Sequence, residues 1–127
     1  FGTLSDSSVS TAIVSFEIST DSANGYAVQV NDDGNFRSGS NDIDDVTDGS
    51  VSEAAEEFGA RSSDTTLSTS TFDTADSALT TSRQDVVTRG SLSIADRSFV
   101  TLKTSISTST TAGSYGNIIS FIASGNF

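Results

Sequence analysis

The alternation of apolar and polar positions is clearest between residues 11 and 30. In "TAIVSFEIST" every second position is apolar from Ala12 to Ile18, so an extended strand would carry Ala12, Val14, Phe16 and Ile18 on one face and Ser15 and Glu17 on the other. The alternation resumes in "YAVQV", directly after Asn24-Gly25, a dipeptide that tolerates the positive φ angles of a tight turn. The pattern therefore predicts two strands that form a β-hairpin.

The next part of the chain has few apolar residues. Turn-forming residues dominate 31–50, which predicts a long surface connection pinned by Phe36, Ile43 and Val46. In 50–58 a serine stands three residues before a glutamate, as in a helix capping box. This stretch predicts either a short helical turn or the start of a strand.

The second half of the chain alternates between weak and strong patterns. Residues 62–82 are rich in serine and threonine and predict long loops with one weak strand, anchored by Leu67, Phe72 and Leu79. Residues 84–108 show two apolar faces. The first contains Leu92 and Ile94, and the second contains Val100, Leu102, Thr104 and Ile106. They predict two strands.

The chain ends in a stretch where apolar residues are adjacent rather than alternating. Its apolar residues are Ile118, Ile119, Phe121 and Ile122. A strand with apolar residues on both faces is typical of one that is covered on both sides. Two explanations remain open: the strand is central within its own domain, or it borders a groove that a strand of another subunit fills.

Short strands separated by turns predict an all-β protein, an antiparallel β-sandwich of Greek-key, Ig-like or pilin-like type with at most one short helical turn. A chain of 127 residues forms one domain. We expect residues 1–10 to be an N-terminal extended segment and 11–127 to be the sandwich domain. The segment carries Phe1, Leu4 and Val9, and is either a donor strand for a neighbouring copy or the first strand of its own domain.

The composition restricts the possible functions. Six Lys and Arg residues against 17 Asp and Glu give a formal net charge of −11, which excludes nucleic acid as a partner because phosphates would be repelled. The chain has no Cys, His, Met, Trp or Pro, so the commonest catalytic groups are missing and we expect no enzyme. No stretch is apolar enough to span a membrane. The abundance of Ser and Thr favours a secreted, cell-surface protein, with Phe1 following a removed signal peptide.

The loops between residues 31 and 48 contain the only candidate metal ligands. The carboxylates concerned are Asp32, Asp33, Asp42, Asp44, Asp45 and Asp48. Carboxylate oxygens are the ligands that Ca²⁺ prefers, but an EF-hand alignment fails because Ser40 occupies the position of the bidentate glutamate. The sequence leaves open a weak Ca²⁺ site or a hydrated acidic loop, and no other cofactor is expected.

Other reactive groups have simple structural interpretations. Glu53, Glu56 and Glu57 are expected to face solvent with like charges side by side. A serine nucleophile would have to use Lys103, the only lysine, as its base, and Lys103 is expected on a strand surface. The remaining possibility for this lysine is an isopeptide bond to an asparagine, Asn117 or Asn126.

The stretch "FGTLSDSSVSTA", the pair Gly25-Tyr26 at the start of a strand and the closing "AGSYGNIISFIASGNF" resemble small secreted β-rich surface proteins of candidate-phyla bacteria. The closing arrangement is also similar to that of pilin and spore-coat-type β-sandwich filament subunits. The resemblance implies an extracellular structural or adhesive role, without catalytic residues. This chain differs from usher-assembled pilins in having no cysteine pair.

From these observations we expect a structural subunit of a pilus-like extracellular filament, a homopolymer assembled head to tail by β-strand donation. The donor and acceptor residues would be Phe1, Leu4, Val9, Ile118, Ile119, Phe121 and Ile122. The alternative is a monomeric adhesin or surface-layer module that binds glycan or a host cell surface through the acidic loops.

Overall fold

The computed structural model describes residues 1–127 and consists of eight β-strands joined by loops, without a helix. The strands are β1 (Ser10–Thr20), β2 (Tyr26–Asp32), β3 (Phe36–Ser38), β4 (Asn41–Ile43), β5 (Glu57–Ser62), β6 (Gln84–Arg89), β7 (Ser93–Ser105) and β8 (Ile119–Gly125). Accordingly, there is no helix of the length and apolar character that crossing a membrane requires.

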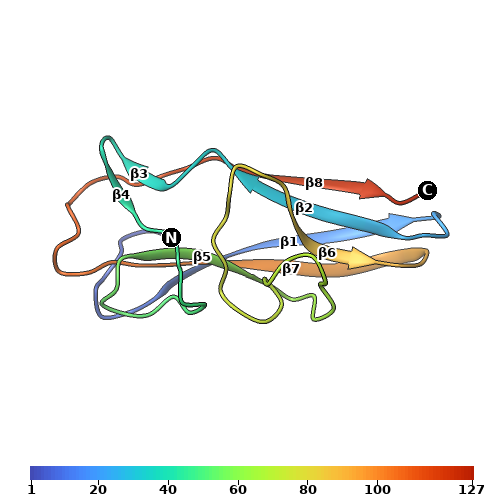
Figure 1. Ribbon diagram of the computed structural model, residues 1–127, viewed down its shortest axis with the longest axis horizontal. Coiled ribbons are helices and arrows are strands. Elements are labelled where there is room, and N and C mark those ends of the chain that lie inside the picture. The colour runs from blue at the N-terminus through green and yellow to red at the C-terminus, as the bar shows by residue number, and fades with distance from the viewer.

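The strands form two three-stranded antiparallel sheets that pack face to face, and a small hairpin. One sheet has the order β1-β7-β5 and the other β6-β2-β8, while β3 pairs with β4. In Figure 1, β2 and β8 lie above β1, β7 and β5, and the long axis of the molecule follows the strands. The prediction of an all-β, sandwich-like fold is confirmed.

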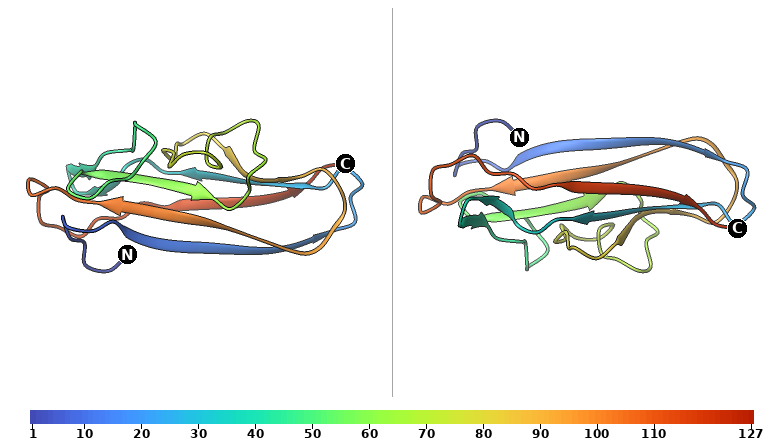
Figure 2. Two further views of the ribbon diagram at one scale, coloured as in Figure 1. Left: turned by 90° about the horizontal axis from the view of Figure 1, so that it is seen from below. Right: turned by 90° about the horizontal axis from the view of Figure 1, so that it is seen from above.

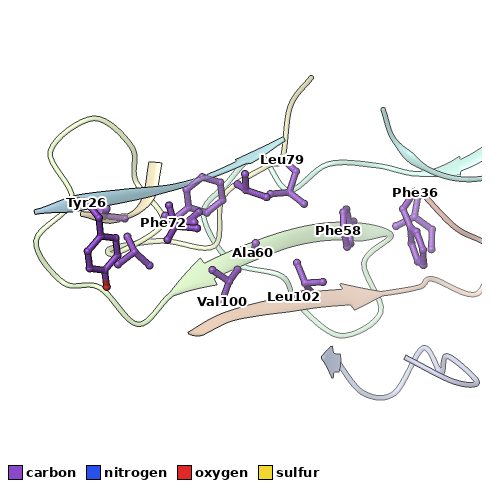
Figure 3. Close-up of a cluster of buried hydrophobic side chains, with 14 residues drawn as sticks. Tyr26, Phe36, Phe58, Ala60, Phe72, Leu79, Val100 and Leu102 are labelled. Atoms are coloured by element: carbon purple, nitrogen blue, oxygen red, sulfur yellow. The ribbon is translucent and has the colours of Figure 1, made fainter. Parts of the chain in front are cut away.

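The core lies between the sheets and contains the alternate residues that the sequence pattern marked. Tyr26, Val28 and Val30 of β2 face Val100 and Leu102 of β7 across the interior, as Figure 3 shows for Tyr26, Val100 and Leu102. The loop residues expected as anchors are also buried. These are Phe36, Ile43, Val46, Leu67, Phe72 and Leu79. Long loops are therefore fastened to the core by single apolar side chains.

The predicted hairpin between the first two strands is wrong. β1 pairs with β7 and β2 pairs with β6 and β8, so the connection at Asn24-Gly25 crosses from one sheet to the other. Gly25 does adopt a positive φ of 73°, and its N–H donates to the carbonyl of Ser22 over 3.1 Å. A turn of this kind suits an inter-sheet connection as well as a hairpin, so the dipeptide fixed the turn but not the pairing.

Three further expectations need correction. Residues 50–58 form no helical turn, and Glu57 instead begins β5, the alternative that the sequence left open. Residues 63–82 form loops without a strand of their own, although Ala60 and Ser77 make an isolated bridge. Residues 84–108 do form two strands, but Leu92 and Ile94 do not define a strand separate from that of Val100. Ile94 and Val100 belong to the same 13-residue strand, β7, and Leu92 lies just before it. The other strand is β6.

Candidate functional site

The two sheets each end in an unpaired edge strand on one side of the sandwich. β1 pairs only with β7 and β8 pairs only with β2. The rings of Phe16 in β1 and Phe121 in β8 lie 5.2 Å apart, which places these two edges beside each other. We call the two neighbouring edge strands, β1 and β8, the open side. On one flank of each strand the main-chain N–H and C=O groups have no strand partner.

Apolar side chains between these edges are only partly covered. Those on β1 are Ala12, Val14, Phe16 and Ile18, and those on β8 are Ile119 and Phe121. Ile118 lies just before β8, and its side chain is exposed to solvent. The interpretation of the last strand as a central one is therefore wrong, and it is an edge strand with a half-buried inner face.

The open side carries only one of the charged residues with which proteins usually protect sheet edges. No Asp, Glu, Lys or Arg follows Lys103, so β8 is uncharged, and Glu17 is the only charged residue of β1. Natural edge strands commonly carry lysine, proline or inward-pointing charges that prevent pairing with other chains. In a chain of net charge −11, these two edges are therefore unusually well suited to pairing.

Residues 1–9 do not form a strand of the sandwich. The Phe1 ring packs edge-on against Phe36 at 5.8 Å and Phe58 at 6.3 Å, and Leu4 packs partly buried against the core. The only hydrogen bonds and bridge of residues 1–8 join Ser5, Ser7 and Ser8 to one another. Side-chain packing alone therefore holds this segment to its own domain.

The packing of this segment creates a pocket with a partly apolar lining at one end of the sandwich. Its volume is about 640 Å³, and its apolar lining includes Phe1, Leu4, Phe36, Ile106 and Tyr115. The rest of the lining comes from Gly2, Thr3 and the connection 110–114. None of the lining side chains is charged. We call this cavity the end pocket.

The acidic loops do not bring their carboxylates together around a metal position. Asp33 binds Arg37 through an ion pair of 2.7 Å and accepts the Ile118 N–H, and these contacts lower the pKa of Asp33 to about 2. Asp42 accepts a hydrogen bond from Asn35, and Asp48 accepts one from the Ser50 N–H. No group of three or more carboxylates is placed to hold a metal ion, so the geometry gives the Ca²⁺ hypothesis no support.

Asp32 and Asp45 lie in less favourable surroundings. Burial raises the pKa of Asp32, which nevertheless accepts hydrogen bonds from the Gly34 N–H and the Asn117 amide. Burial also raises the pKa of Asp45, and the negative charges of its neighbours raise it further. The Oδ1 atom of Asp45 is buried without a hydrogen-bond partner. The Asp44 side chain is exposed, and its main-chain carbonyl accepts the Phe58 N–H.

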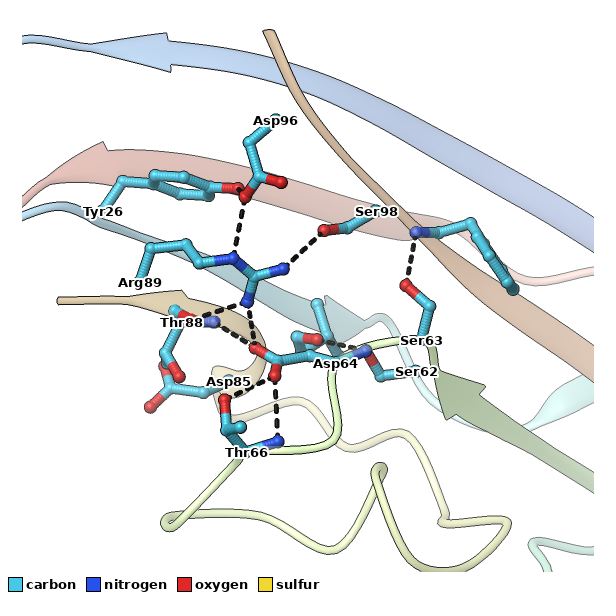
Figure 4. Close-up of polar contacts among 12 residues, drawn as sticks. Tyr26, Ser62, Ser63, Asp64, Thr66, Asp85, Thr88, Arg89, Asp96 and Ser98 are labelled. Carbon is cyan, nitrogen blue, oxygen red and sulfur yellow. Dashed lines mark hydrogen bonds and ion pairs between the residues drawn. The ribbon is translucent and has the colours of Figure 1, made fainter. Parts of the chain in front are cut away.

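Sequence reasoning missed a polar network that closes the interior at the other end of the sandwich (Figure 4). The Arg89 guanidinium donates to Asp64 at 2.8 Å, to Asp96 at 2.7 Å and to Ser98 at 3.2 Å. The Tyr26 hydroxyl donates to the same Asp96 oxygen at 2.7 Å. Burial, followed by the hydrogen bond to Asp96, raises the pKa of Tyr26 to about 12.

Asp64 is the most enclosed member of this network. Its side chain is 2% exposed, and burial opposes its ionisation. Hydrogen bonds from the Thr88 N–H and from Thr66, with the charge of Arg89, outweigh that effect and lower the pKa of Asp64. The network is fully paired and closed to solvent on the Asp64 side, which marks it as structural.

The other candidate reactive groups are held apart. The ammonium group of Lys103 donates to both oxygens of Asp76, at 2.7 and 2.9 Å, and Asp76 is 3% exposed. Asn117 binds Asp32 and the Gly34 carbonyl, whereas Asn126 donates to the carbonyls of Asn24 and Gly25. Both asparagines thus have partners other than Lys103, which leaves the isopeptide hypothesis without support.

The three glutamates at 53–57 also have separate surroundings. Glu53 is exposed, Glu56 accepts a hydrogen bond from Thr110, and Glu57 accepts one from the Ser52 N–H over 2.9 Å. The last two hold loop segments in place.

No family model, curated protein or solved structure matches this chain.

Proposed function

We propose that this protein is a structural subunit of an extracellular, pilus-like filament, in which each copy adds a β-strand to the open side of the next. The observation that carries the proposal is that two edge strands of different sheets, β1 with the single charge of Glu17 and the uncharged β8, lie beside each other around half-buried apolar residues. An added strand would satisfy main-chain groups along the edge and cover Phe16 and Phe121. Two different sheets would gain from a single insertion.

Residues 1–9 are the donor in this proposal. They carry Phe1, Leu4 and Val9 as apolar residues, and no hydrogen bond to the domain has to be broken before they leave. Nine extended residues reach about 30 Å, whereas a seven-residue edge such as β8 is about 23 Å long. The segment is therefore long enough to follow the acceptor edge, where Ile118, Ile119, Phe121 and Ile122 lie.

Donation from one copy to the next is a heterologous contact. The donor segment and the open side are different surfaces, so each subunit keeps one free donor and one free acceptor after pairing. Unless rotation between neighbours closes a ring, such a contact builds a fibre. An export pathway to the cell surface belongs to the same proposal and agrees with the serine- and threonine-rich composition.

A charge placed on the inner face of the acceptor edge tests this function. Ala123 is exposed in β8 opposite the buried Val28, so it shares the inner face with Phe121. Ala123→Lys should leave the domain folded and prevent fibres, because an inserted strand would bury the ammonium group. The neighbouring exposed Ser124 points to the opposite face, and Ser124→Lys is the matched control.

Negative-stain microscopy and sedimentation provide the measurement. We expect fibres from the unmodified protein and from Ser124→Lys, and folded monomers from Ala123→Lys. A shortened chain that starts at Ser10 should likewise fold and fail to assemble. Persistent monomers of the unmodified protein up to millimolar concentration, or fibres from Ala123→Lys, would contradict strand addition at this edge.

A further inference from the structure

The connection between β6 and β7 presents two large apolar side chains to solvent at the end of the sandwich opposite the end pocket. Leu92 is 60% exposed and Ile94 is 82% exposed. We call residues 90–95 the tip. Figure 1 shows the β6–β7 connection at the right, together with the last residue of the chain, whereas β3, β4 and the start of β1 lie toward the left.

The tip is held in a fixed conformation. Ala95 has a positive φ of 51°, a conformation that is rare for a residue with a side chain, and its N–H donates to the Ser19 hydroxyl at 2.9 Å. The pairing of β1 with β7 shifts register in this region, between Ile18 and Thr20, so a bulge interrupts the alternation. The strained backbone is thus tied to β1 while Ile94 points outward, which favours a role for its exposed position.

We propose that the tip of each acceptor copy inserts Leu92 and Ile94 into the end pocket of the copy that donates its strand, in the space that Phe1 and Leu4 vacate. This inference rests on the proposed filament and adds a second contact to it. The occupant is a second copy because the tip and the pocket are complementary in three respects: both present large apolar side chains, neither has a charged side chain, and they lie at opposite ends of one elongated molecule (Figure 2).

The absence of charge at both surfaces matters in a chain of net charge −11. Two copies repel each other wherever their acidic surfaces approach, so a stable contact needs regions without carboxylates. Residues 90–95 and the pocket-lining residues that stay in place when residues 1–9 leave meet this condition. Burial of the two side chains would then add an attraction that does not depend on salt concentration.

Strand donation brings these same two ends together. Residues 1–9 leave the domain at the start of β1, which is the end that holds the pocket. If successive copies point in the same direction, a donor segment that follows the neighbour's open side places that neighbour's far end, the tip, against the pocket. Departure of Phe1 would also uncover Phe36 and Phe58, and the incoming Leu92 and Ile94 would cover them again.

Two measurements on the full chain test this contact. Leu92→Asp should raise the concentration at which half of the protein is in fibres by about tenfold or more, because the carboxylate would be buried against the apolar side chains of the end pocket. Ser68→Asp adds the same charge at an exposed residue outside the tip and should change this concentration far less. Both variants should fold, since both side chains lie in solvent in the monomer.

The second measurement uses the absence of native cysteine. A mixture of one variant with Leu92→Cys and another with Ala112→Cys, which lines the end pocket, should form disulfide-linked pairs under mild oxidation. The rate should exceed by about tenfold that of a mixture of Leu92→Cys with Ser68→Cys, an exposed residue elsewhere, because the assembled state raises the local thiol concentration.

The outcomes separate this inference from the proposed function. If the unmodified protein forms no fibres, the proposed function fails and the tip contact fails with it. If fibres form but Leu92→Asp assembles like the unmodified protein, or the two cysteine mixtures react equally fast, the tip contact is wrong and the filament proposal stands.

Discussion

The rings of Phe16 and Phe121 meet 5.2 Å apart at the edges of the two sheets, where β1 and β8 are not paired with each other through main-chain hydrogen bonds. Their planes are inclined by 56°. This contact joins the two sheets at the open side, where main-chain pairing is absent. The monomer therefore depends here on side-chain packing, and the same packing would support an added strand.

A double-mutant cycle measures that contact in the monomer. Phe16→Ala and Phe121→Ala should each destabilise the fold, and their coupling energy should be about 0.5–1.5 kcal/mol because the two rings touch. Urea unfolding under non-assembling conditions provides the values. Strictly additive effects would show that the rings do not support each other.

Gly25 should tolerate no side chain, although it lies in a connecting loop. A Cβ atom there would lie 1.9 Å from the carbonyl oxygen of Arg89, and the φ of 73° disfavours any other residue. We expect Gly25→Ala to cost more than about 2 kcal/mol. Gly90 has open space around its Cα, so Gly90→Ala is the control and should change stability by less than about 1 kcal/mol. Equal thermal unfolding of the two variants would contradict the close approach at Gly25.

Strands with a clear local pattern of apolar and polar residues could be predicted from the sequence. The strands with which they pair could not. Alternation in β1 and β2 follows directly from having one face in the core, and the sequence shows it without knowledge of the neighbours. The choice of β7 as the partner of β1 depends on residues about 80 positions away. β6 was overlooked because Val86 and Val87 are both buried around a register shift, which hides the period of two.

The candidate site was predictable only in part. The apolar residues of β8 were visible, but whether they lie at an edge or in the centre of a sheet depends on pairing that the sequence does not show. The Arg89 network was not foreseen because Asp64, Arg89 and Asp96 belong to a loop and two strands, with no common spacing. The uncharged stretch after Lys103 was present in the sequence and could have pointed to the edge.

The Arg89 network should contribute strongly to stability. Arg89→Met would leave the carboxylate of Asp64, 2% exposed, without its cationic partner, and removal of one member of a buried ion pair costs about 3–5 kcal/mol. The ion pair between Arg97 and Glu17 is about as short, at 2.7 Å, but both of its side chains are exposed. Arg97→Met should therefore cost less than about 1 kcal/mol. Chemical denaturation of both variants at pH 7 makes the comparison, and similar losses would mean that burial of Asp64 is not decisive.

The last prediction concerns the stability of the fold as a function of pH. Burial and neighbouring carboxylates raise the pKa of Asp45 in the folded state. Its pKa in the unfolded state is about 3.9. At pH values between these two, the folded state therefore binds more protons than the unfolded state. Asp45 therefore makes the fold more stable as the pH falls from neutral through that range. Asp64 has the opposite sign: its folded pKa is lowered, so its contribution is present above about pH 3.9 and is lost as the pH falls further.

The melting temperature should consequently pass through a maximum at mildly acidic pH, above about pH 4. Asp45→Asn removes the unpaired buried charge, and at pH 7 it should raise stability by about 1 kcal/mol, or the melting temperature by about 4 °C. It should also flatten the rise on acidification. Asp21→Asn makes the same charge change at an exposed residue and is the control for the change in net charge. Calorimetry from pH 3 to 8 measures all three proteins, and a melting temperature of Asp45→Asn below that of the unmodified protein at pH 7 would show that the Asp45 carboxylate stabilises the fold.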